Sequence, residues 1–227
     1  MIGIIGAMKP EIDGIKAIIE NKKIEVISGV EYISGTVGET EVVAAQCGIG
    51  KVFAAICAQT MILRYAPEKI INVGVGGTLS KELSIGDIAV ATEVVQHDMD
   101  TSPLGDPIGL LSGINIVKIP CDEALSAKFA KCAEELDIKV KRGVIASGDQ
   151  FIATDIQKEK IKENFSAIAC EMEGGSIGHV CYVNNVDFCV VRAISDSADG
   201  EANMDYPAFM KMAADNSAEV IKRFLKR

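Results

Sequence analysis

One apolar segment of the chain reads Lys69-Ile70-Ile71-Asn72-Val73-Gly74-Val75-Gly76-Gly77-Thr78. Its branched apolar residues predict a buried strand over residues 69–75, which Gly74, Gly76 and Gly77 close. A run rich in Val and Ile is typical of a strand that is covered on both faces. The segment therefore predicts the interior of an α/β sheet.

Similar short apolar runs lie on both sides of this segment and alternate with helical patterns. Residues 2–5 form one such run, which Gly6 ends, and Ile12, Ile15 and Ile19 then recur at helical spacing. The order of elements predicts one domain over residues 1–227, an α/β three-layer sandwich with a mixed central sheet and helices on both faces. The expected strands are 2–5, 25–28, 32–37, 41–46, 69–75, 87–95, 139–147, 167–171 and 186–195, and the expected helices are 8–20, 51–65, 122–136, 155–164, 173–184 and 206–225.

Composition narrows the class of partner. The 227 residues include 23 Lys and Arg against 32 Asp and Glu, which gives a formal net charge of −9. Because phosphate binding relies on clustered Lys and Arg, this balance disfavours nucleic acid and anionic membranes but leaves a neutral nucleoside open. The longest apolar stretch, around residues 53–63, is shorter than the ~20 residues of a membrane helix.

The cysteines and histidines predict neither a disulfide framework nor a metal site. Seven cysteines are scattered without a C-x-x-C pair, and the two histidines, His97 and His179, lack metal-ligand spacing. The N-terminus lacks the basic region that begins a signal peptide. We therefore expect a cytoplasmic protein that holds no metal.

Two glycine motifs resemble nucleotide-binding loops without matching them. Gly74-Val75-Gly76-Gly77-Thr78-Leu79 begins like a dinucleotide fingerprint, but Leu79 stands where the last glycine is required. Two interpretations remain for it: a tight turn, or the close approach of a small ligand to the glycine backbone. Gly50-Lys51 resembles the end of a phosphate loop, but Ala45 replaces the first glycine, which favours a structural turn before a helix. No cofactor is expected.

Acidic residues follow several expected strands, where ligands of such sheets bind. Glu171-Met172-Glu173 opens a helix, whose dipole favours acids at that end. The alternative is a carboxylate that accepts hydrogen bonds from two vicinal hydroxyls. Gly174 and Gly175 come next, although each costs about 1 kcal/mol in a helix relative to alanine. This pair indicates that some group approaches the backbone closely.

A second acidic residue ends the apolar run at residues 188–191, which continues as Arg192-Ala193-Ile194-Ser195-Asp196. Asp196 is either a turn residue or an acid at the rim of an apolar pocket. Phe151, which follows another strand, either packs in the core or stacks on a planar base. Together with Glu11 and Glu173, Asp196 completes a set of strand-end carboxylates, the groups that glycoside hydrolysis uses.

In their order along the chain, these segments resemble the 5′-methylthioadenosine/S-adenosylhomocysteine nucleosidases of the nucleoside phosphorylase superfamily. The resemblance implies a homodimer without a cofactor that hydrolyses the bond between adenine and a 5′-thio-substituted ribose. The segments that carry it are residues 2–8 with Glu11, 48–52, 147–152, 171–173 and 192–196, followed by Ala198-Asp199.

The resemblance also implies a role for each matching residue. Asp196 corresponds to the acid that protonates N7 of adenine, with Ser195 orienting it; Glu11 corresponds to the base that activates water, and Glu173 to the carboxylate that holds the ribose hydroxyls. The remaining positions are Met8 and Met172 at the sugar, Val75 and Gly76 beside the ligand, Phe151 and Ile152 at the base, Arg192 near the water, Tyr206 over the 5′-thio end, and Met99, Thr101 and Leu104 in a loop that reaches the partner subunit's site.

Two departures from the family leave alternatives open. Val75 replaces a serine that helps to hold the water, so Glu11 and Arg192 would do more of that positioning here. Gly174-Gly175 replaces the commoner Ala-Thr near the sugar. The alternatives are a nucleosidase for aminofutalosine or futalosine, a phosphorolytic purine nucleoside phosphorylase, and a nucleoside-binding protein without activity.

Overall fold

The computed structural model describes residues 1–196 and 206–226, with Tyr206 and Pro207 described by their backbone alone. The predicted Ala198-Asp199 motif and the side chain of Tyr206 therefore lie outside the described residues.

The described strands form one mixed sheet with β5 near its middle. β5 runs parallel to β1 and β10, and its last residues, Gly77 and Thr78, pair antiparallel with β9. The order across the sheet is β10-β6-β8-β9-β5-β1-β4-β3-β2, and the additional β10–β5 pairing closes its first half into a ring. The strands are β1 (Ile2–Gly6), β2 (Glu20–Ile27), β3 (Val30–Val37), β4 (Thr40–Gln46), β5 (Lys69–Thr78), β6 (Ile88–Gln96), β7 (Lys118–Pro120), β8 (Val140–Ser147), β9 (Ala167–Glu171) and β10 (Asp187–Asp196).

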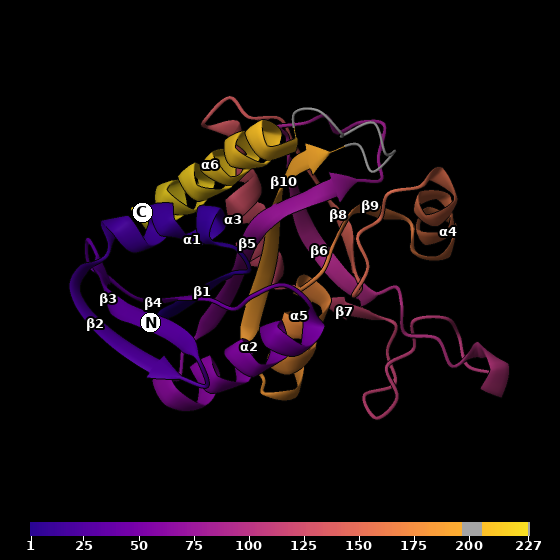
Figure 1. The fold of residues 1–227 in the computed structure, drawn as a ribbon, viewed down its shortest axis with the longest axis horizontal. Coiled ribbons are helices and arrows are strands. Elements are labelled where there is room, and N and C mark those ends of the chain that lie inside the picture. Colours follow the sequence, from indigo (N-terminus) through magenta and orange to yellow (C-terminus); the bar gives the residue numbers. More distant parts are fainter. Residues whose placement is uncertain (197–205, 227) are drawn as a thin grey trace.

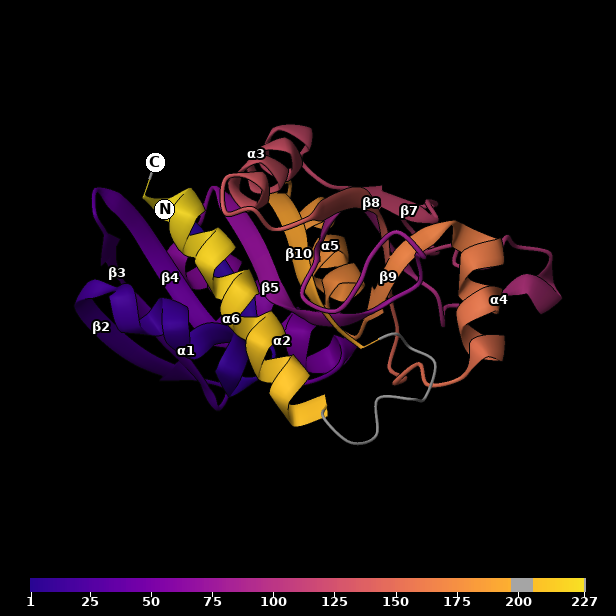
Figure 2. The same cartoon turned by 90° about the horizontal axis from the view of Figure 1, so that it is seen from above.

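Helices cover both faces of this sheet, as the sequence predicts. Figure 1 shows α1, α3 and α6 on one side of the strands and α2 and α5 on the other, with α4 beside β8 and β9; Figure 2 shows α6 lying across the first of these faces. The helices are α1 (Lys9–Ile18), α2 (Lys51–Tyr65), α3 (Glu123–Glu134), α4 (Asp155–Phe165), α5 (Gly174–Val183) and α6 (Tyr206–Leu225). The architecture is an α/β three-layer sandwich.

Side chains of the central strands point alternately to the two faces of the sheet, so that each layer of helices packs against apolar residues. Ile5 and Ile70 pack in the cluster beneath α2 and α5, whereas Ile4 and Ile71 pack in the cluster beneath α1, α3 and α6. Successive side chains of a strand point to opposite faces, so an unbroken apolar run is what a strand between two layers requires. The apolar runs of the sequence therefore reflect burial on both faces.

The structure corrects the prediction for the end of the central strand. Gly74, Gly76 and Gly77 do not close β5, which continues in extended conformation through Thr78. Glycine in a strand marks a close approach of another group or a bend where a sheet closes on itself. Both occur here, because β5 changes partner at Gly77 and other groups lie against Gly74 and Gly76.

Smaller differences lie at the periphery. β2 begins earlier than residue 25, and the three-residue strand β7 was not predicted because three residues carry too little periodicity. The segment between β6 and β7 contains a short 3₁₀ helix at Ser102–Leu104. Asp122 is the N-cap of α3, because its side chain accepts a hydrogen bond from the Leu125 amide at 2.7 Å.

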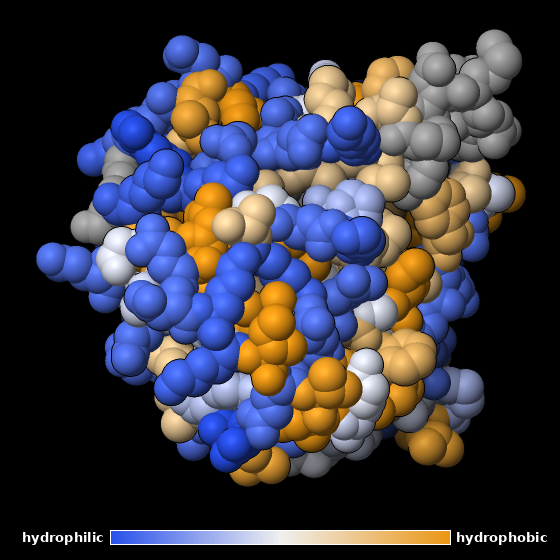
Figure 3. Space-filling model, turned by 60° about the vertical axis from the view of Figure 1, so that its left-hand side comes forward, coloured by the Kyte–Doolittle hydropathy of each residue, from blue (hydrophilic) through white to orange (hydrophobic). Residues whose placement is uncertain are grey.

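Hydrophilic residues predominate on the face drawn in Figure 3, with hydrophobic residues in small groups between them. No helix within residues 1–196 and 206–226 is long and apolar enough to span a membrane.

Candidate functional site

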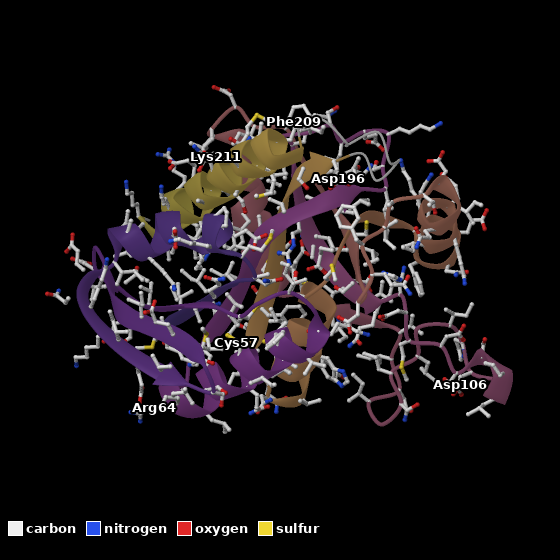
Figure 4. All side chains as sticks on the ribbon, viewed as in Figure 1. Cys57, Arg64, Asp106, Asp196, Phe209 and Lys211 are labelled. Carbon is white, nitrogen blue, oxygen red and sulfur yellow. The ribbon has the colours of Figure 1, made fainter. Side chains whose placement is uncertain are left out.

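A cavity opens where the carboxyl ends of β1, β5, β9 and β10 meet. Its volume is about 620 Å³, counted out to its solvent mouth, and Asp196, labelled in Figure 4, is one of its lining residues. The structure brings ten predicted residues to its wall: Met8, Glu11, Val75, Gly76, Phe151, Ile152, Met172, Glu173, Ser195 and Asp196.

Glu11 is held in this cavity by the backbone of two strand ends. Its Oε2 accepts hydrogen bonds from the amides of Ala7 and Met8 at 2.9 and 2.7 Å, and its Oε1 accepts one from the Val75 amide at 3.0 Å. Glu11 is also the third residue of α1, so the bond from Met8 closes half of a capping box. Burial raises the pKa of Glu11, although Arg192 and the three amides oppose this shift.

The glycine at position 74 makes room for this carboxylate. A β-carbon on Gly74 would lie 2.6 Å from Oε1 of Glu11, closer than such atoms approach. Val75 contributes its backbone amide to Glu11, while its side chain lines the cavity. The position therefore helps to hold Glu11 through its backbone, without a side-chain hydroxyl.

Glu173 lies across the cavity at the start of α5. Its Oε1 accepts a hydrogen bond from the Gly50 amide at 2.9 Å, and its Oε2 lies 3.8 Å from Nη2 of Arg192. Burial raises the pKa of Glu173 to about 7, and the neighbouring Glu171 and Glu11 add to this, while Arg192 and the Gly50 amide oppose it. Glu173 therefore exchanges its proton near neutral pH.

Glu171 is a structural carboxylate that the sequence analysis did not assign to the site. Its Oε2 accepts hydrogen bonds from the amides of Glu173 and Gly174 at 3.0 and 2.8 Å, and Ser147 donates to its Oε1. The Gly175 amide donates to Ser147 at 2.5 Å, and a β-carbon on Gly175 would lie 2.9 Å from that side chain. The close approach that the glycine pair predicts thus comes from Ser147.

Arg192 lies behind the carboxylates and is not among the residues that line the cavity. Its side chain is 1 % exposed and donates hydrogen bonds to the carbonyls of Asn72 and Val191, to the side chain of Asn72 and to Glu171. Burial opposes its charge, but Glu171, Glu173 and Glu11 raise its pKa above the ordinary value. Its placement favours holding the carboxylates over the predicted contact with water.

Ser195 and Asp196 both reach the cavity because β10 is irregular at its end. The register against β5 shifts between Ile194 and Asp196, so Asp196 lies opposite Gly77. In a regular strand two consecutive side chains point to opposite faces, whereas a bulge re-aims one of them. The Ser195 hydroxyl donates to Oδ2 of Asp196 at 2.9 Å, and both residues are buried.

The remaining wall is largely apolar. Phe151 is 59 % exposed at the rim, whereas Ile152 is buried, and Met8 and Met172 are half-buried. Sequence reasoning missed six other lining residues, most of which neighbour a predicted one along the chain: Ala7, Ile49, Gly77, Gln150, Cys170 and Glu171.

Besides Arg192, three predicted residues lie away from this wall within the described chain. Met99, Thr101 and Leu104 belong to the loop after β6, and Leu104 is 83 % exposed. No group of three or more His, Cys, Asp and Glu side chains suited to a metal ion occurs in the part of the chain that the structure describes.

The chain matches a known protein family over nearly its whole length. Residues 1–226 match the family described as the Phosphorylase superfamily. The chain belongs to this superfamily. A 5′-methylthioadenosine/S-adenosylhomocysteine nucleosidase from Shewanella halifaxensis is 36 % identical over 227 residues, which cover 100 % of this chain and 99 % of that protein.

Two solved structures from Helicobacter pylori show the same superfamily fold. One is a futalosine hydrolase, with a TM-score of 0.94 and 38 % identity over 99 % of this chain and 97 % of that one. The other is a mutant 5′-methylthioadenosine/S-adenosylhomocysteine nucleosidase with 5′-methylthioadenosine in its active site, with a TM-score of 0.94 and 37 % identity over the same shares.

Replacing Glu173 with Gln should stabilise the protein in a pH-dependent way. Because the pKa of Glu173 is raised in the folded state from 4.5 to about 7, its ionisation destabilises the fold as pH rises through that interval. The unfolding free energy of Glu173→Gln relative to wild type should therefore grow by ~3 kcal/mol between these values and then level off. Urea unfolding at several pH values measures this, with the exposed Glu163→Gln as control. A difference that stays constant with pH would contradict the shift.

Proposed function

We propose that this protein hydrolyses the N-glycosidic bond of 5′-methylthioadenosine and S-adenosylhomocysteine, releasing adenine and the 5-thio-substituted ribose. One observation carries the proposal: among the described residues, the cavity wall combines four carboxylates with apolar side chains and contains no Lys or Arg. Glycoside hydrolysis needs an acid for the leaving group, a base for water and negative charge near the developing cation. The names of the relatives support the same reaction.

Asp196 is the proposed acid. Adenine is a poor leaving group until its ring is protonated, and a carboxyl group in a largely apolar cavity is suited to deliver that proton to N7. The hydrogen bond from Ser195, at 2.9 Å, supports a role for this hydroxyl in orienting Asp196. General acids of this kind contribute about 10²–10⁴-fold to a rate.

Glu11 is the proposed base. Its raised pKa makes it a stronger base than an ordinary carboxylate, and three backbone amides fix its position. The position of this carboxylate therefore does not depend on a side-chain group at Val75. Arg192 supports this arrangement from outside the wall by its charge.

Glu173 is the carboxylate that we expect to accept hydrogen bonds from the ribose hydroxyls. In that place its charge also stabilises the cation that forms as the glycosidic bond breaks. Met8 and Met172 are the proposed sugar contacts, Phe151 stacks on adenine, and the backbone of Ile152 reads the base edge. Tyr206 remains the proposed residue over the 5′-thio end.

Phosphorolysis is the alternative that the charges of the wall oppose. Phosphate binding draws on several cationic or backbone donors. Among the described lining residues the titratable groups near Glu11 are acidic, and the amides of Ala7, Met8 and Val75 already donate to Glu11. Water therefore fits this site better than a phosphate anion.

A second candidate substrate is futalosine or aminofutalosine. The futalosine hydrolase of Helicobacter pylori is as similar in structure as the methylthioadenosine-bound nucleosidase. Comparing kcat/KM for methylthioadenosine, S-adenosylhomocysteine and aminofutalosine decides between them.

The outer face of α2 supports the proposal of a homodimer. Val52, Phe53 and Ile56 recur at helical spacing on α2 and are 69, 60 and 44 % exposed, and Ile49, just before the helix, is 53 % exposed. An exposed apolar face of this kind is typical of a protein interface. Because Ile49 also lines the cavity, a second copy on this face would lie at its mouth, where the Met99, Thr101 and Leu104 loop of the partner could reach it.

The seven cysteines are free and buried, which supports a reducing compartment such as the cytoplasm.

Asp196→Asn should leave nucleoside binding within about tenfold of wild type and reduce adenine release by at least ~10²-fold, because the amide has no acidic proton to deliver. The assay follows adenine release from methylthioadenosine without phosphate, with binding measured by calorimetry. Asp187→Asn, at the exposed start of the same strand, is the control. Substantial turnover by Asp196→Asn would overturn this role, and a requirement for phosphate would overturn hydrolysis.

Gly74→Ala should displace Glu11 and lower kcat by ~10²-fold while the protein stays folded, because the clash falls on the end of a flexible side chain. Gly14→Ala is the matched control, since a β-carbon there meets ordinary contacts at 3.5 Å and beyond. Circular dichroism checks the fold. Wild-type kcat in Gly74→Ala would argue against Glu11 as the base.

Phe53→Asp should convert the dimer to a monomer, because a charge in an apolar interface stays unpaired. Sedimentation velocity measures the mass, and Ile156→Asp, at an 83 % exposed position on α4, controls for a surface charge. A wild-type protein that is monomeric at micromolar concentration would refute the dimer.

A further inference from the structure

Three loops meet beside the cavity in a closed ring of hydrogen bonds. Nζ of Lys51 donates to Oδ1 of Asp98 at 2.6 Å, and the Asp149 amide donates to Oδ2 of Asp98 at 2.9 Å. The Lys51 amide donates to Oδ1 of Asp149 at 2.7 Å, which closes the ring. Lys51 begins α2, Asp98 follows β6 and Asp149 follows β8, so the ring joins segments that are 47 and 98 residues from Lys51.

Two of the three ring residues are partly buried. The side chains of Lys51 and Asp98 are 19 % and 16 % exposed, whereas Asp149 is exposed. Burial opposes ionisation of Asp98, but the hydrogen bonds from Lys51 and from the Asp149 amide, with the charge of Lys51, keep its pKa below the ordinary value. Hydrogen bonds to charged groups are about twice as strong as neutral ones. The partly buried pair of Lys51 and Asp98 is therefore better suited to fix loop geometry than an exposed ion pair.

Two of the ring residues, Lys51 and Asp149, have neighbours along the chain that line the cavity or contact its carboxylates. Gly50, directly before Lys51, donates its amide to Glu173 at 2.9 Å. Phe151 comes two residues after Asp149 and lines the cavity. Lys51 also contacts Gln96 at 3.3 Å, and Gln96 in turn donates to the Gly175 carbonyl in the first turn of α5 at 3.4 Å.

The backbone at Gly50 shows how closely these groups fit. Gly50 has φ +97°, a conformation that favours glycine, and a β-carbon there would lie 3.0 Å from Oδ1 of Asp149. With this geometry the Gly50 amide points to Glu173 while the next amide points to Asp149. The Gly50 amide thus bonds a carboxylate of the cavity, and the Lys51 amide bonds a residue of the ring.

We propose that Lys51, Asp98 and Asp149 are positioning residues for the reaction: their ring holds the Gly50 amide against Glu173 and holds the start of the segment that carries Phe151. The inference rests on the proposed function for its effect on turnover. The ring itself touches neither the base nor the sugar. The hydrogen-bonded ring acts by fixing the distance between Glu173, which holds the ribose, and Phe151, which stacks on the base.

Lys51→Met tests the proposal. Losing the ring should lower kcat/KM for methylthioadenosine by about 10²-fold, because misplacement of a substrate-holding group by ~1 Å has an effect of this size. Asp98→Asn should lower it in the same direction, and Lys51→Arg, which keeps the charge, should recover part of the loss. Lys16→Met is the matched control, since Lys16 is similarly buried at 14 % exposure and pairs with Glu31 at 3.1 Å.

A double variant distinguishes a ring from separate contacts. If Lys51 and Asp98 act through one ring, Lys51→Met with Asp98→Asn should lose little more than either single variant, because effects within one network are not additive. Losses that multiply would overturn the shared role.

The pH profile separates positioning from general loss of stability. Glu173 faces Glu171, Arg192 and Glu11 as well as the Gly50 amide, and that amide lowers its pKa. Displacing the amide in Lys51→Met should therefore move the acidic limb of kcat/KM to higher pH, with the other three groups unchanged. A variant that is only less stable would keep the limb in place.

The outcomes of the two proposals are distinguishable. A wild-type protein without nucleosidase activity refutes the proposed function, and carboxyl carbon NMR of Glu173 in wild type and Lys51→Met then tests the ring without substrate. Two results would overturn the proposal, provided that Lys51→Met is folded. One is a kcat/KM within about twofold of Lys16→Met together with an unshifted acidic limb. The other is a titration of the Glu173 resonance that does not shift between wild type and Lys51→Met.

Discussion

The rest of the site depends on the contacts of one buried group, the guanidinium of Arg192. It joins β10 to β5 through Asn72 and to β9 through Glu171, and it lies 3.8 Å from Glu173. Taking such a charge out of water is costly unless partners surround it, and removing one partner of a buried ion pair costs about 3–5 kcal/mol. Arg192 therefore stabilises the carboxylates of Glu171 and Glu173, and these carboxylates in turn stabilise its charge.

This arrangement places more carboxylates than cationic groups in a small volume. Burial raises the pKa values of Glu11 and Glu173, and the neighbouring carboxylates help to raise that of Glu173 to about 7, although the one guanidinium of Arg192 opposes both shifts. Groups that exchange protons near neutral pH are those that acid–base catalysis uses. The raised pKa values of these buried carboxylates in the cavity wall thus support the proposed acid–base chemistry.

The fold and much of the site were predictable because their signals are local. Residues 51–65 have helical spacing after a glycine turn, and the structure has α2 over the same residues. Strand-end acids follow apolar runs closely, which is why Glu11, Glu173 and Asp196 stood out. Gly74 was misinterpreted as a strand end, because its reason for being glycine is the carboxylate of Glu11, 63 residues away. β7 was missed because three residues show no period.

The sequence by itself determined the α/β class and the order of elements, which follow from period and composition. It also predicted which acidic residues belong to the site, through their position after apolar runs and the resemblance to a known family. Only the tertiary structure decided that Arg192 lies behind the wall, that a bulge turns Ser195 and Asp196 to one cavity, and that Lys51, Asp98 and Asp149 form a ring. The physical reason is that hydrogen bonds and desolvation depend on distances in space, which chain-distant residues acquire only when the sheet assembles.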